Sequence, residues 1–186
     1  QAMKRGMHHI FEGQIPERLK GIGVTGQMHT LIVVGEDGRP VRPAMMWNDT
    51  RTKDLLPELK EKIQEFPEGE YLSQTISTGS PAANLYWLKV YEPENLKKVR
   101  KFLIGPDYLV YRLTGNQTTD YCEASTSCLY EICNKRWSEE IRNLIESKIG
   151  KKLDIDVRQV EEGRRFEDSF VDIEKLINMD IVVEDD

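Results

Sequence analysis

The side chains best suited to hold a small polar molecule follow directly on the glycine-rich stretch 21–26. They are Gln27, Met28 and His29. Gln and His both donate and accept hydrogen bonds, as recognition of a hydroxyl group requires. The stretch begins Gly-Ile-Gly-Val and predicts a short buried strand, and ligands in open α/β sheets collect where strands end. We therefore predict part of a ligand site here; the alternative is a polar strand end with one satisfied core histidine.

A second polar group closes the hairpin that is predicted next, and it consists of Trp47, Asn48 and Asp49. The predicted arms are 30–34 and 42–47, and Asp37-Gly38 between them supplies the positive φ angles that a tight turn needs. Prolines in the second arm indicate an edge strand, because proline cannot donate to a ladder. Since the hairpin joins the two polar groups, we expect them to lie side by side.

The second group allows more than one interpretation. Trp47 offers a flat apolar surface suited to an apolar face of a small ligand, although aromatic side chains more often belong to a core. Asp49 and Arg51 are expected to form an ion pair or a cap that fixes the loop. We interpret Arg51 as structural and leave Asn48 and Asp49 open between structure and ligand binding.

Helices account for most of the remaining chain. Apolar periodicity and capping signals predict them over 1–11, after a cap at Asp49 or Thr50, from Ser80-Pro81, over 94–101, over 105–115, and from Ser138 to Gly150. Pro57 is expected to delay or kink the second of these. Asp120 precedes Glu123 with the spacing of a capping box.

Other residues that resemble catalytic or ligating groups have plainer explanations. Asp107 lies in a predicted first helical turn and Asp120 at a predicted N-cap, where carboxylates are common for structural reasons. His8 and His9 are adjacent in a helix and do not share a face. The glycines of 23–26 match neither known glycine-rich nucleotide pattern. The sequence therefore predicts no catalytic, cofactor-binding or metal-binding residue.

Composition describes a soluble globular protein. The 186 residues are 39% hydrophobic and 31% charged, with a net charge of −6. This is too apolar for disorder and too acidic for non-specific nucleic-acid binding. No apolar run approaches a membrane span, no secretory leader is visible, and the cysteines show no framework or zinc spacing, which favours a cytoplasmic protein. From Lys151 onward the chain becomes acidic, so we divide it into a domain over 1–150 and a tail of unclear relation over 151–186.

An ordered set of short motifs carries a family resemblance. They are Gly26-Gln27-Met28-His29, Arg42-Pro43-Ala44, Trp47-Asn48-Asp49-Thr50-Arg51-Thr52, Tyr86-Trp87-Leu88-Lys89, Glu92-Pro93-Glu94, Pro106-Asp107-Tyr108-Leu109 with the following Arg112-Leu113-Thr114-Gly115, Thr119-Asp120-Tyr121, Ala124-Ser125 and Arg136-Trp137-Ser138. Together they resemble the FGGY carbohydrate kinases, and most of all their xylulose kinases. The resemblance implies a partial actin-like, ribonuclease-H-like ATPase domain of the α/β class, with a mixed sheet flanked by helices.

The resemblance also implies a substrate, cofactors and site residues. Such kinases transfer the γ-phosphate of ATP to a sugar with Mg²⁺, and in xylulose kinases the Met-His pair, here Met28 and His29, touches the sugar. By the same resemblance Gln27, Trp47, Asn48 and Asp49 belong to the substrate site. Glycerol kinases typically carry Arg-Glu where this chain has Met28-His29, which argues against glycerol, while another pentulose stays open.

The resemblance further implies that much of such a kinase is not present. Family members are more than twice this length, begin with an Asp-x-Gly-Thr phosphate turn and carry a later Gly-Gly-x-Asp turn that holds the catalytic base. Neither turn is found here, so we expect a fragment with no kinase activity of its own and no bound ATP or Mg²⁺. The alternative is a non-catalytic sugar-binding or regulatory remnant. An uncovered sheet edge predicts dimerisation, strand exchange or aggregation.

Overall fold

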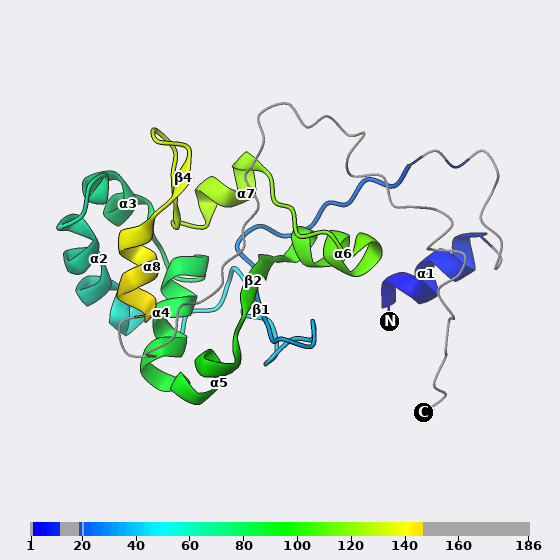
Figure 1. The fold of residues 1–186 in the computed structure, drawn as a ribbon, viewed down its shortest axis with the longest axis horizontal. Coiled ribbons are helices and arrows are strands. Elements are labelled where there is room, and N and C mark those ends of the chain that lie inside the picture. Colours follow the sequence, from blue (N-terminus) through cyan, green and yellow to red (C-terminus); the bar gives the residue numbers. More distant parts are fainter. Residues whose placement is uncertain (1, 12–18, 20, 147–186) are drawn as a thin grey trace.

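The computed structural model describes residues 2–11, 19 and 21–146. The predicted acidic tail and the end of the last predicted helix lie outside these residues. Helix α1 (Ala2–Phe11) forms where the sequence predicts a helix, and it lies apart from the other elements in Figure 1. The rest gather around a small sheet, with α4 and α8 on one side of it and α6 on the other (Figure 1).

The sheet is built on two antiparallel strands, β1 (Leu31–Val34) and β2 (Lys101–Ile104). On the other edge of β1, isolated bridges join Leu31 to Met45 and Val34 to Pro40. The predicted hairpin is therefore confirmed, and its turn contains Gly38 at φ 74°. Its second arm pairs only at these bridges, as expected for an edge segment interrupted by proline.

The strand predicted at the start of the stretch 21–26 is wrong. These residues have no regular secondary structure, and Gly21, Gly23, Thr25 and Gly26 are exposed. A strand requires a neighbour for its backbone hydrogen bonds. In the described part of the chain, β1 already pairs with β2 on one edge and with the return arm on the other. The stretch is extended but has no ladder to join.

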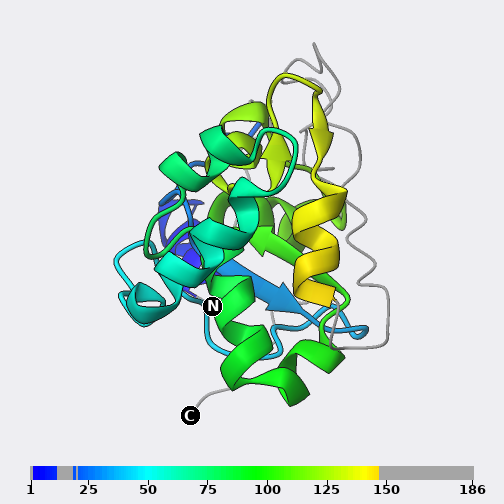
Figure 2. The same cartoon turned by 90° about the vertical axis from the view of Figure 1, so that its left-hand side faces the viewer.

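Helices α2 (Leu56–Gln64), α4 (Pro81–Tyr91) and α8 (Glu139–Glu146) supply much of the core. Figure 2 shows them in front of the sheet. The core residues come from strands and helices alike: Leu31, Val33, Phe102, Leu59, Ile63, Leu85, Leu88, Ile141 and Ile145. α4 begins at Pro81 and α8 follows Ser138, whose Oγ accepts from the Ile141 amide at 3.3 Å, so both predicted starts are confirmed.

The start of α2 departs in part from the expectation. A short 3-10 turn, η1 (Lys53–Leu55), precedes the helix, and Pro57 lies in the first helical turn, which confirms the delayed start. The cap predicted at Asp49 or Thr50 is wrong. Thr52 is the N-cap of η1 and Leu55 that of α2, and neither makes a side-chain capping bond. Asp49 instead accepts from the amide of Arg51 at 3.0 Å, since short polar side chains readily close such local turns.

The remaining elements connect these layers. They are α3 (Gly69–Thr75), α5 (Pro93–Lys98), α7 (Tyr121–Thr126), and the strand pair β3 (Tyr130–Glu131) and β4 (Arg136–Trp137). The sequence analysis predicted none of α3, β2, β3 and β4. The predicted cap of α7 is confirmed, because Asp120 Oδ1 accepts from the Glu123 amide at 2.9 Å.

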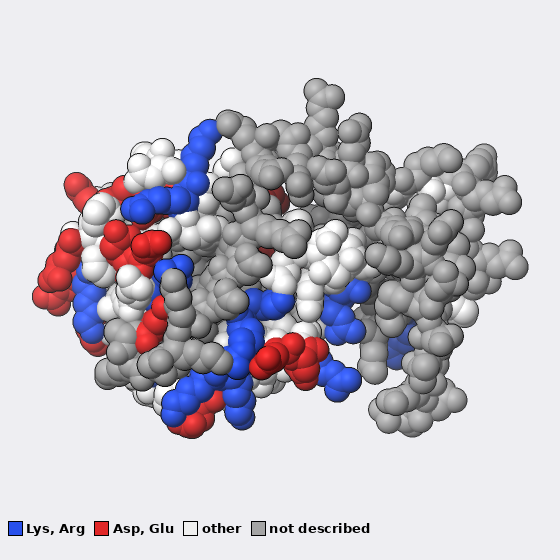
Figure 3. Space-filling model, in the orientation of Figure 1, with Lys and Arg blue, Asp and Glu red and all other residues white. Residues whose placement is uncertain are grey.

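The surface carries charges of both signs. Figure 3 shows acidic side chains over α2 and α3, and basic side chains near α5 and the start of β2. Of the three cysteines, Cys128 is buried, whereas Cys122 and Cys133 are exposed. Among the described residues, no helix is both long and apolar enough to cross a lipid bilayer.

Helix α6 (Gly105–Thr114) has the buried Asp107 in its first turn and Gly115, with φ 76°, at its C-cap. Asp107 Oδ2 accepts from the amide of Ile104 at 3.4 Å, which confirms the structural role predicted for this residue. Burial is the main cause that raises the pKa of Asp107 to about 7, while the nearby Glu123 and Asp120 carboxylates add to it. A proton on Asp107 therefore favours the folded state.

We expect replacement of Asp107 by Asn to remove a pH dependence of stability. Because the pKa of Asp107 is raised on folding, its contribution is present below about pH 4 and is lost as the pH rises through about 7. The wild-type free energy of unfolding should fall by about 1–3 kcal/mol across this range relative to Asp107→Asn, which keeps the acceptor for Ile104. Urea unfolding at a series of pH values measures the difference. Parallel pH profiles of the two proteins would contradict it.

Candidate functional site

One pair of backbone hydrogen bonds sets the distance between the two predicted polar groups. The Leu31 amide donates to the Met45 carbonyl at 2.8 Å, and the Met45 amide donates to the Leu31 carbonyl at 3.0 Å. One residue further, Thr30 Oγ1 lies 3.9 Å from Met46 Sδ. The group 27–29 ends just before Thr30, and the group 47–49 begins just after Met46. The structure thus places both groups at the same end of the hairpin, as the sequence predicts.

The first group lies against the beginning of α6. A Cβ atom added to Gly26 would lie 3.1 Å from Cγ of Pro106, and one added to Gly105 would lie 3.4 Å from the Gln27 carbonyl oxygen. Gln27 is exposed and Met28 is 52% exposed, so their side chains are open to a ligand. The small residues therefore allow the loop to approach the helix closely while its side chains face outward.

His29 combines partial burial with an unusual backbone conformation. Its φ is 63°, in the left-handed region, which few non-glycine residues adopt. Burial lowers the pKa of His29 below its ordinary value, so the ring is neutral over more of the physiological range. A neutral imidazole has one donor and one acceptor nitrogen, which suits a hydroxyl group.

Trp47 is an exposed residue, not a member of the core. Its side chain is 51% exposed, which excludes the core alternative considered from the sequence. Its backbone packs instead against the turn before α4, where a Cβ atom added to Gly79 would lie 2.0 Å from the Trp47 carbonyl oxygen. Gly79 is held in turn by Asn84, whose Nδ2 donates to the Gly79 carbonyl at 3.1 Å. The buried helix end therefore supports an indole that faces solvent.

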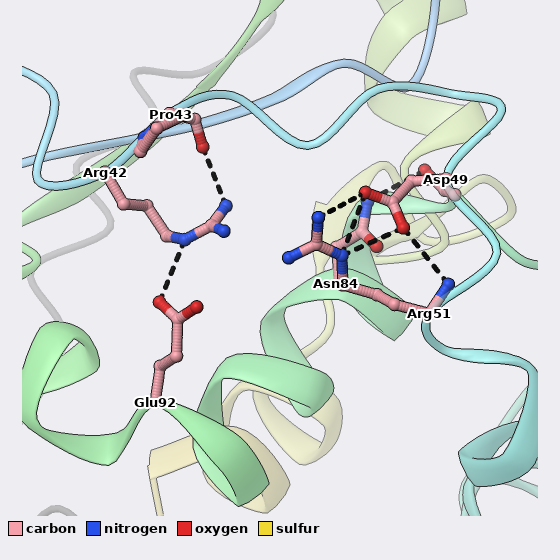
Figure 4. A network of polar contacts seen from close by, with 7 residues as sticks. Arg42, Pro43, Asp49, Arg51, Asn84 and Glu92 are labelled. Carbon is pink, nitrogen blue, oxygen red and sulfur yellow. Dashed lines mark hydrogen bonds and ion pairs between the residues drawn. The ribbon is translucent and has the colours of Figure 1, made fainter.

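Asp49 is engaged by Arg51, and this pair fixes the loop after Trp47 (Figure 4). Arg51 Nη2 lies 2.8 Å from Asp49 Oδ2, and Arg51 Nε lies 2.9 Å from each carboxylate oxygen. Hydrogen bonding from Arg51 is the main cause that lowers the pKa of Asp49. The guanidinium also lies 4.8 Å from the ring centroid of Trp87 on α4. Arg51 has the structural role predicted for it, and Asn48 beside it is exposed.

A second ion pair anchors the return arm of the hairpin. Arg42 Nε lies 2.9 Å from Glu92 Oε2, and Arg42 Nη1 donates to the Pro43 carbonyl at 2.7 Å (Figure 4). Burial opposes ionisation of Glu92, but hydrogen bonds from Asn95 and Arg42 hold its pKa below the ordinary value. The arm that carries Trp47 is thus attached to the junction between α4 and α5.

The structure also contains a small pocket that sequence reasoning missed. It is lined by Phe102, Leu103, Ile104, Asp107, Gln117, Thr118, Thr119 and Trp137, and it includes none of the predicted substrate-binding residues. Three of its residues, Asp107, Thr119 and Trp137, belong to separate motifs of the family resemblance, but nothing in the sequence indicates that these motifs meet. Asp107 is the only ionisable residue among those that line it.

The described residues do not fit a nucleotide or a metal ion. The glycines of 23–26 lie in an extended segment, and Gly26 packs on Pro106, so they form no phosphate-binding turn before a helix. Within the described ranges, no group of three or more His, Cys, Asp or Glu side chains is placed to hold a metal ion. The site therefore offers hydrogen-bonding and apolar side chains to a ligand.

We expect Gly79→Ala to destabilise the protein more than Gly115→Ala does. Both glycines have a positive φ, 81° and 76°, so alanine strains both backbones. Only at Gly79 does the new methyl group collide with the Trp47 backbone; at Gly115 it meets nothing within 4 Å. We expect a loss of about 1 kcal/mol for Gly115→Ala and about 2–4 kcal/mol for Gly79→Ala in urea unfolding. Equal losses would show that the Gly79–Trp47 contact imposes no constraint.

Comparison with known proteins places this geometry in a family. The sequence model of the N-terminal domain of the FGGY family of carbohydrate kinases matches residues 1–149. A xylulose kinase from Staphylococcus xylosus is 33% identical over 141 residues, which are 76% of this chain and 29% of that protein. A xylulose kinase from Lactococcus lactis is 37% identical over 127 residues, which are 67% of this chain and 25% of that protein. The chain thus spans less than a third of the length of these relatives.

Solved structures confirm the fold class. The ligand-bound xylulose kinase from Lactobacillus acidophilus superposes with a TM-score of 0.67 at 22% identity, over 84% of this chain and 31% of that one. A gluconate kinase from the same species gives 0.64 at 24% identity, over 80% and 30%. The α/β fold is that of part of a sugar kinase of the actin-like ATPase class. On the evidence of the matched domain and the related sequences, this chain belongs to the FGGY family of carbohydrate kinases.

Proposed function

We propose that this chain provides part of the sugar site of an ATP-dependent carbohydrate kinase, and that the sugar is D-xylulose, phosphorylated at its terminal hydroxyl. The observation that carries the proposal is the placement of Met28 and His29 at the same end of the hairpin as the exposed Trp47. The related xylulose kinases support the choice of sugar. The fold alone does not make that choice, because a gluconate kinase shares it.

Each substrate-binding residue has a chemical role in this proposal. Gln27 and His29 donate hydrogen bonds to sugar hydroxyls and accept hydrogen bonds from them. A sugar with a different arrangement of hydroxyls would leave some of these groups unpaired and would therefore bind more weakly. The exposed faces of Trp47 and Met28 cover the C–H surface of the sugar. Asn48 adds an amide next to the indole, and Asp49 contributes through Arg51 by fixing the loop.

Phosphoryl transfer requires groups that the described residues around the proposed sugar site do not provide. Positioning of the nucleotide, Mg²⁺ and a carboxylate base carries most of such catalysis. Asp107 and Asp120 are engaged as helix caps, and the described residues fit neither a nucleotide nor a metal ion. We therefore propose that ATP and Mg²⁺ bind to the whole kinase through regions that correspond to the parts of the related kinases not matched by this chain.

A sugar titration tests the proposed site. We expect D-xylulose to shift the NMR signals of 27–29 and 47–48 at millimolar concentration, and glycerol to shift them far less. His29→Ala should weaken D-xylulose at least about tenfold, the loss expected when a hydrogen bond to a polar ligand is removed. His9→Ala is the matched control, because His9 is an exposed histidine on α1. Equal affinities of the two variants would contradict the role of His29.

An activity assay tests whether this chain has kinase activity by itself. We expect no formation of ADP from ATP, Mg²⁺ and D-xylulose by this chain, because its described residues place no catalytic base at the proposed sugar site. A coupled ADP assay on protein freed of host kinases measures it, with a complete xylulose kinase as the positive control. ADP formation that requires D-xylulose and copurifies with the chain would overturn this part of the proposal.

A further inference from the structure

The turn before α4 is closed by its own backbone and is then fixed to the helix by one side chain. The Ser80 amide donates to the Ser77 carbonyl at 3.2 Å, and Gly79 inside this turn has φ 81°, a value that favours glycine. Asn84 lies in the first turn of α4 (Figure 4), and its Nδ2 donates to the Gly79 carbonyl at 3.1 Å. The Asn84 amide therefore sets the orientation of the Gly79 peptide.

Asn84 is an unusual residue for the interior of the protein. It is 0% exposed, and its neighbours Ala83 and Leu85 are buried too. Asn84 Oδ1 is buried and accepts no hydrogen bond from any described residue, which costs stability. An apolar side chain of similar size would avoid this cost, so the apolar core gives no reason for an amide here. The reason lies in the Gly79 carbonyl, for which Asn84 Nδ2 is the donor.

Gly79 in turn supports the backbone of Trp47. A Cβ atom added to Gly79 would lie 2.0 Å from the Trp47 carbonyl oxygen and 3.1 Å from Trp47 Cα, so the two backbones are in direct contact. Trp47 itself lies in a turn, because the Asp49 amide donates to the Met46 carbonyl at 3.0 Å. The two turns therefore pack against each other, and the half-exposed indole projects from the second of them.

We propose that Asn84 is a positioning residue for Trp47: its amide holds the Gly79 carbonyl, and Gly79 fixes the peptide from which the indole projects. Asn84 is too deeply buried to touch a ligand, and it acts only through Gly79. Residues that break the rules of core packing are expected where they serve a site. The contacts stand on the structure, whereas their consequence for sugar binding rests on the proposed function.

The first readout does not involve sugar. Asn84→Leu nearly keeps the shape of the side chain but removes the donor to Gly79 together with the unpaired acceptor. We expect the indole and amide NMR signals of Trp47 to move in this variant, while the indole signal of Trp137 keeps its native position and so reports a folded protein. Asn143→Leu is the matched control, because Asn143 is an exposed asparagine in α8, and it should leave the Trp47 signals unmoved.

A second variant separates the lost hydrogen bond from side-chain bulk. Asn84→Ala removes the same donor without adding any atom, so we expect the Trp47 signals to move here as well. Trp47 signals that move in Asn84→Leu but not in Asn84→Ala would assign the change to bulk and overturn the proposal. Unmoved Trp47 signals in whichever of the two variants folds would overturn it too.

The second readout links the contact to the ligand. We expect Asn84→Ala to weaken D-xylulose binding about tenfold, and the shifts that D-xylulose still causes to fall on 27–29 and no longer on 47–48. Wild-type affinity would overturn the positioning role, and so would an equal loss of shifts in both groups, which indicates a general disturbance of the fold. If the Trp47 signals move in the variants but the wild type does not bind D-xylulose, the contact stands and the proposed function fails.

Discussion

The pairing of Leu31 with Met45 is the constraint on which the arrangement of the site depends. These two residues exchange both backbone hydrogen bonds, and β2 covers the other edge of the same strand. Because side chains alternate along a strand, a slip of one residue at this pair would turn every core side chain of β1 outward. The buried Leu31 and Val33 therefore fix the register, and the register fixes the distance between the two polar groups.

The two groups are then held by different helices. The turn before His29 rests on α6 through Gly26 and Gly105, whereas the loop after Trp47 rests on α4 through Gly79 and Arg51. Close backbone packing holds the first group and the Asp49–Arg51 ion pair holds the second, while the hairpin contributes Leu31, Val33 and Met45 to the apolar core. A substitution in one support should therefore change one half of the site and leave the other half in place, since distant contacts without shared partners act independently.

Local signals in the sequence identify most of the helices and the hairpin. Pro81, Gly115 and Asp37-Gly38 fix backbone angles by their own chemistry, so their elements are predictable from a few residues. The strand β2 has no such signal, because a short apolar run after basic residues does not distinguish a strand from a helix end. Helix α3 follows Glu68, which adopts φ 60° without being glycine. The stretch 21–26 has a strand-like sequence, but a strand forms only where a neighbouring strand can accept and donate its backbone hydrogen bonds.

In the candidate site, too, some features have local sequence signals and others depend on contacts between distant residues. The residue types at 27–29 and 47–49 can be read from the sequence, and the hairpin that joins them has a local turn signal. The supports could not be predicted, because Pro106 and Gly79 lie far from Gly26 and Trp47 along the chain and carry no pattern that links them. Contacts of this kind arise from the packing of helices on the sheet.

Intermolecular nuclear Overhauser effects between bound D-xylulose and the chain would show which side chains contact the sugar. If the sugar binds at the proposed site, its protons should contact the Trp47 indole and the Met28 methyl group, which are both exposed at the same end of the hairpin. Contacts to Trp137, which lines the separate pocket with Phe102 and Asp107, would contradict it. The absence of any contact to Trp47 or Met28 in a protein that binds the sugar would contradict it equally.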